Sequence, residues 1–348
     1  MNKVLSILLA IAVSLPLLAE DASGQAGAYL KMGVGARALG MGGSFTAIAD
    51  DGTAAFWNPA GLVQLNKKSI STMHTVLKLD RTYNFLNYIQ PLKKRKAAWG
   101  INYTRFGVDN MNETHIWRYT DNTHTAVSRD LTYGDAVTTT DGRIIPVTVG
   151  DSAIANNFSI NYNQWKALYG GNNLEIFSTF DDSEWALSLS YAQVMNKKTY
   201  LGGNLKYLKQ ELFDYNADSY ALDLGFMYLA NSKTKLGLSI RDIGAKLKWD
   251  TPSGHSDKVP VTSTLGIAYS PKKSINIAMD YTNIDNGENI FHAGIEGYIK
   301  NKFGVRFGTD NGDFTMGASV KASEWNIDYA FRDQELGNEH RLSATYSF

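Results

Sequence analysis

The chain contains no cysteine, so disulfide bonds and thiolate metal sites are excluded and its stability must come from burial and backbone pairing. It has no excess of either charge, because 34 basic residues balance 34 acidic ones, and this gives no argument for a nucleic-acid partner. Beyond residue 18 no apolar run approaches the about 20 residues that a membrane-spanning helix needs. The 348 residues suffice for one large domain or two ordinary ones.

Motifs that carry catalysis are also missing. The sequence has no G-x-S-x-G, H-E-x-x-H, P-loop or EF-hand pattern, and its six histidines lack a serine or acid at a distinctive spacing. Scattered aspartates beside Asn and Gly could collect calcium, although they are ordinary loop chemistry: Asp109, Asp121, Asp130, Asp135, Asp141 and Asp151. We therefore expect no enzyme, no cofactor and no metal site, with calcium left open.

Residues 1–24 have the pattern of a secretory signal peptide. Lys3 provides a basic start, residues 4–18 form an apolar run, and small residues follow. Cleavage after Ala19 or after Gly24 fits this pattern equally well. The mature chain is therefore predicted to be exported.

Residues 25–66 form a Gly/Ala-rich segment with no strand periodicity. Asn58 before Pro59 predicts a helix N-cap followed by an N1 proline. Gly33, Gly35 and Ala38 match the G-x-G-x-x-G/A dinucleotide motif, which requires a buried strand before it and a helix after it. A leader precedes this segment and several glycines follow, so we disfavour nucleotide binding.

From residue 69 onward the sequence alternates with period two, which predicts β-strands. In residues 341–348 Leu342, Ala344, Tyr346 and Phe348 alternate with polar residues. About fourteen such strands of about nine to twelve residues can be counted, an even number typical of membrane-spanning barrels. The predicted strands include Lys96–Phe106, Glu184–Met195 and Ser219–Ala230.

The connections between these strands alternate in length, which favours a barrel over a soluble sandwich or propeller. Short Lys-rich turns recur on one predicted edge, at residues 93–95, 196–198, 231–233, 271–273 and 300–302. Longer links are predicted on the other edge, at residues 213–218, 244–260, 285–290, 333–339 and above all 107–183. The fold class is therefore all-β: a transmembrane antiparallel β-barrel of about fourteen strands over residues 67–348, with residues 107–183 as a long extracellular loop.

The face of the strands opposite the apolar one carries charges, which a barrel would place in its lumen. These predicted lumen residues are Asp223, Arg241, Asp280, Glu296, Arg306, Asp328 and Arg332. Glu296 is expected to lie beside Arg306, and Asp328 near Arg332. Such a network either holds a plug in place or forms a conduction or gating site, and the sequence leaves both open.

Residues 36–62, ARALGMGGSFTAIADDGTAAFWNPAGL, resemble the amino-terminal signature of outer-membrane barrels of the long-chain fatty-acid transporter (FadL) family, and most closely their PorV/PorQ-type branch. The rest of the chain is similar in architecture alone. The resemblance implies that residues 25–66 form a hatch in the barrel lumen. The hatch residues so implied are Gly33, Arg37, Gly40, Gly42, Gly43, Asp50, Asp51, Phe56, Trp57, Asn58, Pro59, Gly61 and Leu62.

A last strand that ends in Phe348, with Tyr346 two residues before it, resembles the assembly signal of outer-membrane barrels. The resemblance implies a location in the outer membrane, with its lipid and the barrel-assembly machinery as partners. In the PorV/PorQ branch the function is type IX protein secretion by binding exported proteins or secretion-system components. The alternative is a FadL-like channel for hydrophobic small molecules such as fatty acids.

Overall fold

The structure is a computed structural model that describes residues 26–77, 81–120, 125–128, 136–138, 144–146, 174–285, 287, 289–333 and 338–348. The predicted signal peptide, residues 1–24, lies outside this part of the chain. The side chains of the six aspartates that were considered as calcium ligands also lie outside the described part of the chain. Among the described residues, no helix is both long and apolar enough to cross a membrane.

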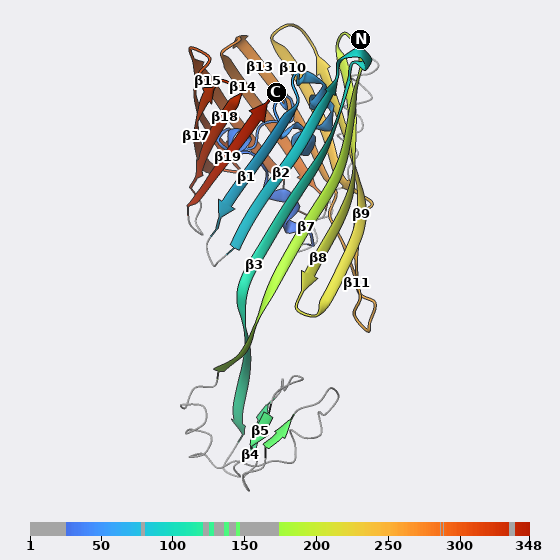
Figure 1. The fold of residues 1–348 in the computed structure, drawn as a ribbon, viewed down its shortest axis with the longest axis vertical. Helices are drawn as coiled ribbons and strands as arrows, with labels where there is room; N and C mark the ends of the chain where they lie inside the picture. Colours follow the sequence, from blue (N-terminus) through green and yellow to red (C-terminus); the bar gives the residue numbers. More distant parts are fainter. Residues whose placement is uncertain are drawn as a thin grey trace. The chain divides into compact units, whose positions relative to one another are not determined.

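Fourteen strands form a closed antiparallel β-barrel, as the sequence predicted (Figure 1). The last of them, β19, pairs with both β18 and β1, which closes the ring. At the seam the backbones of Lys68 and Phe348 exchange hydrogen bonds of 2.9 and 3.1 Å. The strands are β1 (Ser69–Val76), β2 (Arg81–Leu92), β3 (Ala97–Thr120), β7 (Leu174–Asn196), β8 (Thr199–Leu212), β9 (Tyr215–Leu229), β10 (Thr234–Ile243), β13 (Thr262–Lys272), β14 (Ile275–Ile284), β15 (Asn289–Ile299), β16 (Phe303–Asp310), β17 (Asp313–Ala322), β18 (Trp325–Arg332) and β19 (Glu339–Ser347).

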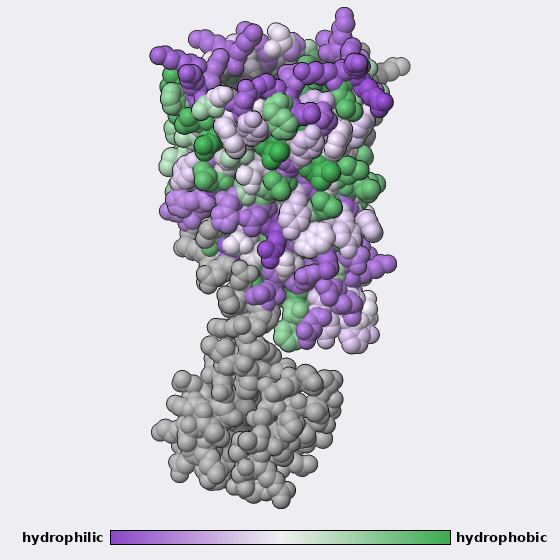
Figure 2. All heavy atoms as spheres, in the orientation of Figure 1, coloured by the Kyte–Doolittle hydropathy of each residue, from purple (hydrophilic) through white to green (hydrophobic). Residues whose placement is uncertain are grey.

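Each strand alternates between an exposed apolar face and a buried face that is largely small or polar. On β9, for example, Tyr220, Leu222 and Leu224 are exposed, whereas Ala221 and Asp223 are buried. Figure 2 shows apolar side chains across the middle of the barrel wall and hydrophilic ones at the end that carries the short turns. This inverts the pattern of a water-soluble protein, because the outer wall of a membrane barrel faces lipid.

Short turns at one end and longer links at the other confirm the predicted alternation, with two corrections. The predicted loop 107–183 is wrong at both ends, since β3 continues to Thr120 and β7 begins at Leu174. The predicted link 213–218 is wrong as well, because β9 begins at Tyr215 and leaves a two-residue turn. Polar residues near these strand ends do not show the period-two apolar pattern, so the sequence did not predict that the strands continue. Backbone pairing alone can extend a hairpin beyond its apolar stretch.

Residues Asp109–Asp182 cluster as a second compact unit. Its described short strands are β4 (Thr125–Ser128), β5 (Ala136–Thr138) and β6 (Ile144–Pro146), and β5 pairs with β6. In the first unit, the predicted link 244–260 contains a small hairpin of β11 (Lys246–Trp249) and β12 (Ser256–Lys258). The turn after β2 is a 3₁₀ helix, η3 (Lys93–Arg95).

The N-terminal segment, residues 26–66, consists of four short helical turns: η1 (Ala28–Lys31), α2 (Ala36–Leu39), α3 (Ala54–Trp57) and η2 (Pro59–Gln64). The predicted cap is present, because Asn58 Oδ1 accepts a hydrogen bond from the Ala60 N–H and Pro59 opens η2. A helical turn, η1, precedes the glycine motif, where a dinucleotide site would need a buried strand.

Candidate functional site

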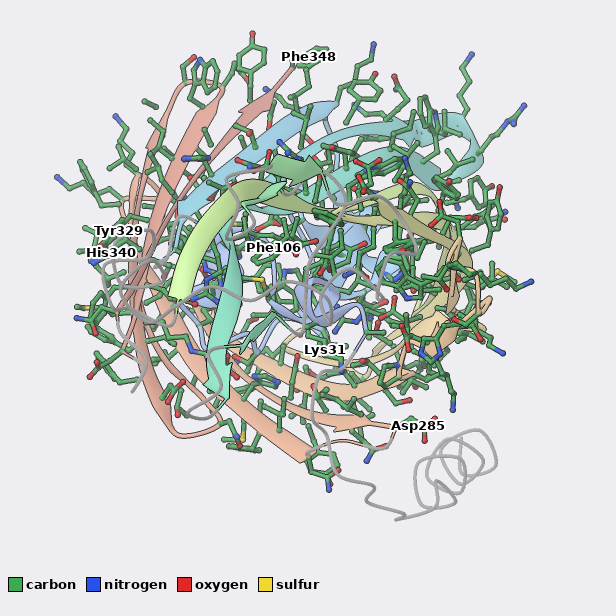
Figure 3. All side chains as sticks on the ribbon, turned by 90° about the horizontal axis from the view of Figure 1, so that it is seen from below. Lys31, Phe106, Asp285, Tyr329, His340 and Phe348 are labelled. Carbon is green, nitrogen blue, oxygen red and sulfur yellow. The ribbon has the colours of Figure 1, made fainter. Side chains whose placement is uncertain are left out.

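The N-terminal segment packs against the inner face of the barrel wall, and Figure 3 shows Lys31 of this segment inside the ring of strands. Glycines that face each other across neighbouring strands make room for its backbone. A Cβ at Gly294 or Gly308 would overlap Met41, and one at Gly202 or Gly225 would overlap the turn at Pro59. Gly237 leaves the same kind of space at the Thr46 backbone, whereas Gly266 leaves space for the Asp280 carboxylate that binds the segment. The inner face of the wall therefore has space for the segment where these glycines lie.

Arg37 of α2 joins the segment to the wall through a buried charge network. Its guanidinium donates two hydrogen bonds to Glu296, of 2.5 and 3.0 Å, and pairs with Asp50 at 2.6 Å and Asp51 at 3.0 Å. Burial opposes the charge of Arg37, but Asp50 and Glu296 outweigh burial and raise its pKa well above the ordinary value. The two-pronged contact with Glu296 fixes the orientation of α2 as well as its position.

The same network continues along the wall from Glu296. Arg306 lies 3.1 Å from Glu296 and 3.0 Å from Asp328, and its side chain is fully buried. The predicted pair of Glu296 and Arg306 is thus present. The predicted partnership of Asp328 with Arg332 is wrong, because Arg332 pairs instead with Asp310 and Asp313, at 2.5 and 2.8 Å. Arg332 and Asp328 lie four residues apart along one strand, and side chains from β16 and β17 reach each of them first.

A second buried cluster contains the predicted residue Asp223. Lys206 pairs with Asp223 at 2.8 Å and with Asp242, and Asn204 bridges Asp223 to the Ala55 carbonyl of the segment. Lys206 was not among the predicted lumen residues, although its inward position follows from the period-two pattern of β8. Asp242 could not be found in that way, because a β-bulge between Ile240 and Ile243 turns it inward beside Arg241, against the alternation of the strand.

Other wall residues bind the segment through its backbone. Asp280 accepts hydrogen bonds from the N–H groups of Phe45 and Thr46, at 2.9 and 2.8 Å. Arg341 donates to the carbonyls of Met32 and Gly33, and His292 contacts the Gly42 carbonyl at 2.8 Å. Sequence reasoning found Asp280 and missed Arg341 and His292, whose role depends on which backbone atoms lie opposite them.

Some of the predicted apolar residues of the segment are packed against other residues, and others line cavities. Leu62 is fully buried beside Ala49 and Ile89, and Gly61 lies against the Ala49 backbone. Phe56 and Trp57 form an edge-to-face pair at 5.3 Å. The remaining implied glycines serve the turns and the close approach: Gly33, Gly42 and Gly43 have positive φ, and Gly40 contacts the Gly317 backbone.

Two small cavities lie between the segment and the wall, one on each side of Phe56 and Arg241. The first has a volume of about 60 Å³ and is bounded by Leu39, Phe56 and Trp57 of the segment and by threonines of the wall. The second, of about 30 Å³, is lined by Leu30 and by polar groups including Asn102 and Lys206. A dry engineered cavity that holds benzene measures about 150 Å³, so these cavities accept such a ring only after the segment or its side chains move.

Tyr346 and Phe348 lie on the outer face at the seam. Trp325, Tyr346 and Phe348 form a ring ladder with centroid distances of 4.9 and 5.5 Å. Figure 3 shows Phe348 at the wall, away from Lys31 in the lumen. Their predicted role in assembly stays a prediction.

No protein-family model matches this chain, and no curated protein matches it in sequence. Among solved structures, the toluene transporter TodX of Pseudomonas putida is similar with a TM-score of 0.54 and 12% identity, over 90% of this chain and 98% of that one. A FadL homologue of Pseudomonas aeruginosa has a TM-score of 0.54 and 11% identity over the same shares. The toluene transporter TbuX of Ralstonia pickettii has a TM-score of 0.51 and 12% identity, over 90% of this chain and 97% of that one. The chain thus has the fold of FadL-type outer-membrane transporters.

Proposed function

We propose that this protein is an outer-membrane channel that admits small hydrophobic compounds past a lumenal hatch formed by the N-terminal segment. The observation that carries this proposal is the first cavity, where Leu39, Phe56 and Trp57 line a space between the segment and the wall. Narrow, partly apolar cavities suit small apolar solutes, whereas a general porin keeps a wide aqueous channel. The likeness in fold to two toluene transporters supports the same class of solute.

The secretion function implied by the PorV/PorQ resemblance has less support. The resemblance of residues 36–62 to that branch stays a prediction, and the solved structures reported above include no secretion component. A secretion role would assign partner binding to the unit Asp109–Asp182 rather than to the barrel lumen. The two functions therefore depend on different parts of the chain.

Uptake measurements in a Gram-negative host can test the channel directly. We expect cells that carry the protein to take up labelled toluene faster than cells without it. Leu39→Asp places a carboxylate in the first cavity. Because toluene could then enter the cavity only by stripping water from this charge, which is costly, toluene uptake should fall at least about ten-fold. Leu39→Met keeps the volume and apolar character of the side chain, and uptake should stay within about two-fold of the parent.

Removal of residues 117–169 separates the channel from the secretion function. A channel should keep its toluene uptake after this deletion. If the parent confers no toluene uptake, and the deletion abolishes capture of exported proteins, the channel proposal is wrong and secretion replaces it.

A further inference from the structure

Arg241 differs from most other cations that face the barrel lumen, and Lys235, which donates a hydrogen bond to Gln64, is another exception among the described residues. Arg37, Lys206, Arg306, Arg332 and Arg341 each pair with at least one carboxylate. Within the described residues Arg241 has no ion pair, and its partner is the ring of Phe56, with the guanidinium carbon 4.9 Å from the ring centroid. Arg241 also lines both cavities. This contact with the ring uses none of the N–H donors of the guanidinium, so they can serve a ligand.

A second polar group beside Arg241 also lacks a partner. Thr262 is the direct cross-strand neighbour of Arg241, is 1% exposed, and lines the first cavity. Its hydroxyl makes no hydrogen bond in the described structure, whereas Thr264 and Thr282 bond to each other at 2.9 Å. A buried unsatisfied hydroxyl is costly, so an acceptor that reaches the cavity would gain from it. Arg241 and Thr262 together offer a charged donor and a hydroxyl to one oxyanion.

The register of β10 against β13 places this pair directly opposite each other, next to a bulge in β10. Asp242 has a positive φ of 64°, and the bulge lets Asp242 turn inward to Lys206 while Arg241 stays free of it. The carboxylate next in sequence to Arg241 is therefore engaged elsewhere. Lys31 lines the same cavity and adds positive charge, and the carboxylate of Asp310, which also lines it, is engaged by Arg332 at 2.5 Å and His292 at 2.9 Å.

We propose that Arg241 and Thr262 form a binding site for the carboxylate of an aromatic monocarboxylic acid. This inference rests on the proposed channel function and names a solute class for it. A single carboxylate matches one guanidinium fork and one hydroxyl. The ring of the acid packs against Trp57 and Leu39 and displaces Phe56 from Arg241, since aromatic rings favour edge-to-face contact with such neighbours.

Benzoate and toluene make a matched pair of probes, because they differ only in a carboxylate and a methyl group. Calorimetry on the full chain in detergent should show benzoate binding that weakens as salt rises. Arg241→Gln should weaken benzoate binding at least about ten-fold, the scale of a charged hydrogen bond, and should reduce benzoate uptake far more than toluene uptake. Arg241→Lys, which keeps the charge but loses the fork, and Thr262→Val should each weaken benzoate binding by a smaller factor.

Lys235→Gln is the control, since Lys235 faces inward on the same strand and lines neither cavity. Retention of heat-modifiable gel mobility shows that each variant is folded. If the parent takes up toluene but neither binds nor takes up benzoate, the acid site is refuted while the channel stands. Equal losses for both solutes in Arg241→Gln would also refute it. If the parent takes up neither solute, the channel proposal fails, and this inference fails with it.

Discussion

Arg37 is the residue that most directly couples the N-terminal segment to the barrel. It holds three carboxylates, two from its own segment and one from β15, and its side chain is 12% exposed. Glu296 retains Arg306 when Arg37 is lost, so the wall keeps its own ion pair. The effect of removing Arg37 should therefore fall on the segment.

Arg37→Gln should destabilise docking of the segment by about 3–5 kcal/mol, the usual effect of breaking a buried ion pair. Hydrogen exchange by mass spectrometry should show faster exchange in residues 36–57, with the wall strands unchanged. Lys67→Gln breaks the exposed pair with Glu324 and should alter stability by less than about 1 kcal/mol. Unchanged exchange in Arg37→Gln would mean that packing alone holds the segment.

At the scale of elements, paired glycines on neighbouring strands create the space in which the segment lies. Gly294 on β15 faces Gly308 on β16, and Met41 fills the gap between them. An inward side chain at such a pair meets backbone atoms, which cannot rotate away. Close packing of this kind explains why the N-terminal segment, whose helices are short, keeps one position in a polar lumen.

Gly294→Val should displace Met41 and cost about 1–3 kcal/mol through overpacking. We expect a lower melting temperature, read from heat-modifiable mobility, and entry of a normally excluded antibiotic into cells. Gly297→Val on the same strand is the matched control, because a Cβ at Gly297 meets no atom within 4 Å. Equal behaviour of the two variants would show that the glycine pairs do not position the segment.

For the whole molecule, the strand connections predict the orientation in the membrane. Short turns of outer-membrane barrels lie on the periplasmic side and longer links outside. Ser253 lies in the β11–β12 hairpin, and Lys197 lies in the short turn between β7 and β8. Both positions are exposed.

Ser253→Cys should therefore react with an impermeant maleimide on intact cells, and Lys197→Cys should react only after the cells are opened. The natural chain has no cysteine, so the signal comes from the introduced thiol alone. Labelling of Lys197→Cys on intact cells, with Ser253→Cys protected, would invert the orientation.

Much of the fold could be predicted from the sequence because its causes are local. Strand alternation has a period of two residues, the Lys-rich turns lie between consecutive strands, and Asn58 caps the helical turn that follows it directly. The inward charges Glu296 and Arg306 follow from the same alternation. An extended strand such as β3 escaped prediction because the polar stretch at residues 109–115, DNMNETH, interrupts the apolar alternation that marks a lipid-facing wall.

The site depended on contacts between distant parts of the chain. Arg37 and Glu296 are 259 positions apart, and neither residue signals the other. The bulge that turns Asp242 to the same side as Arg241 breaks the alternation on which sequence reasoning relies. The glycine pairs are recognisable only when strand register places them opposite each other and the segment against them. Local periodicity therefore accounts for the wall, whereas closure of the barrel around the N-terminal segment selects the side chains that meet in the lumen.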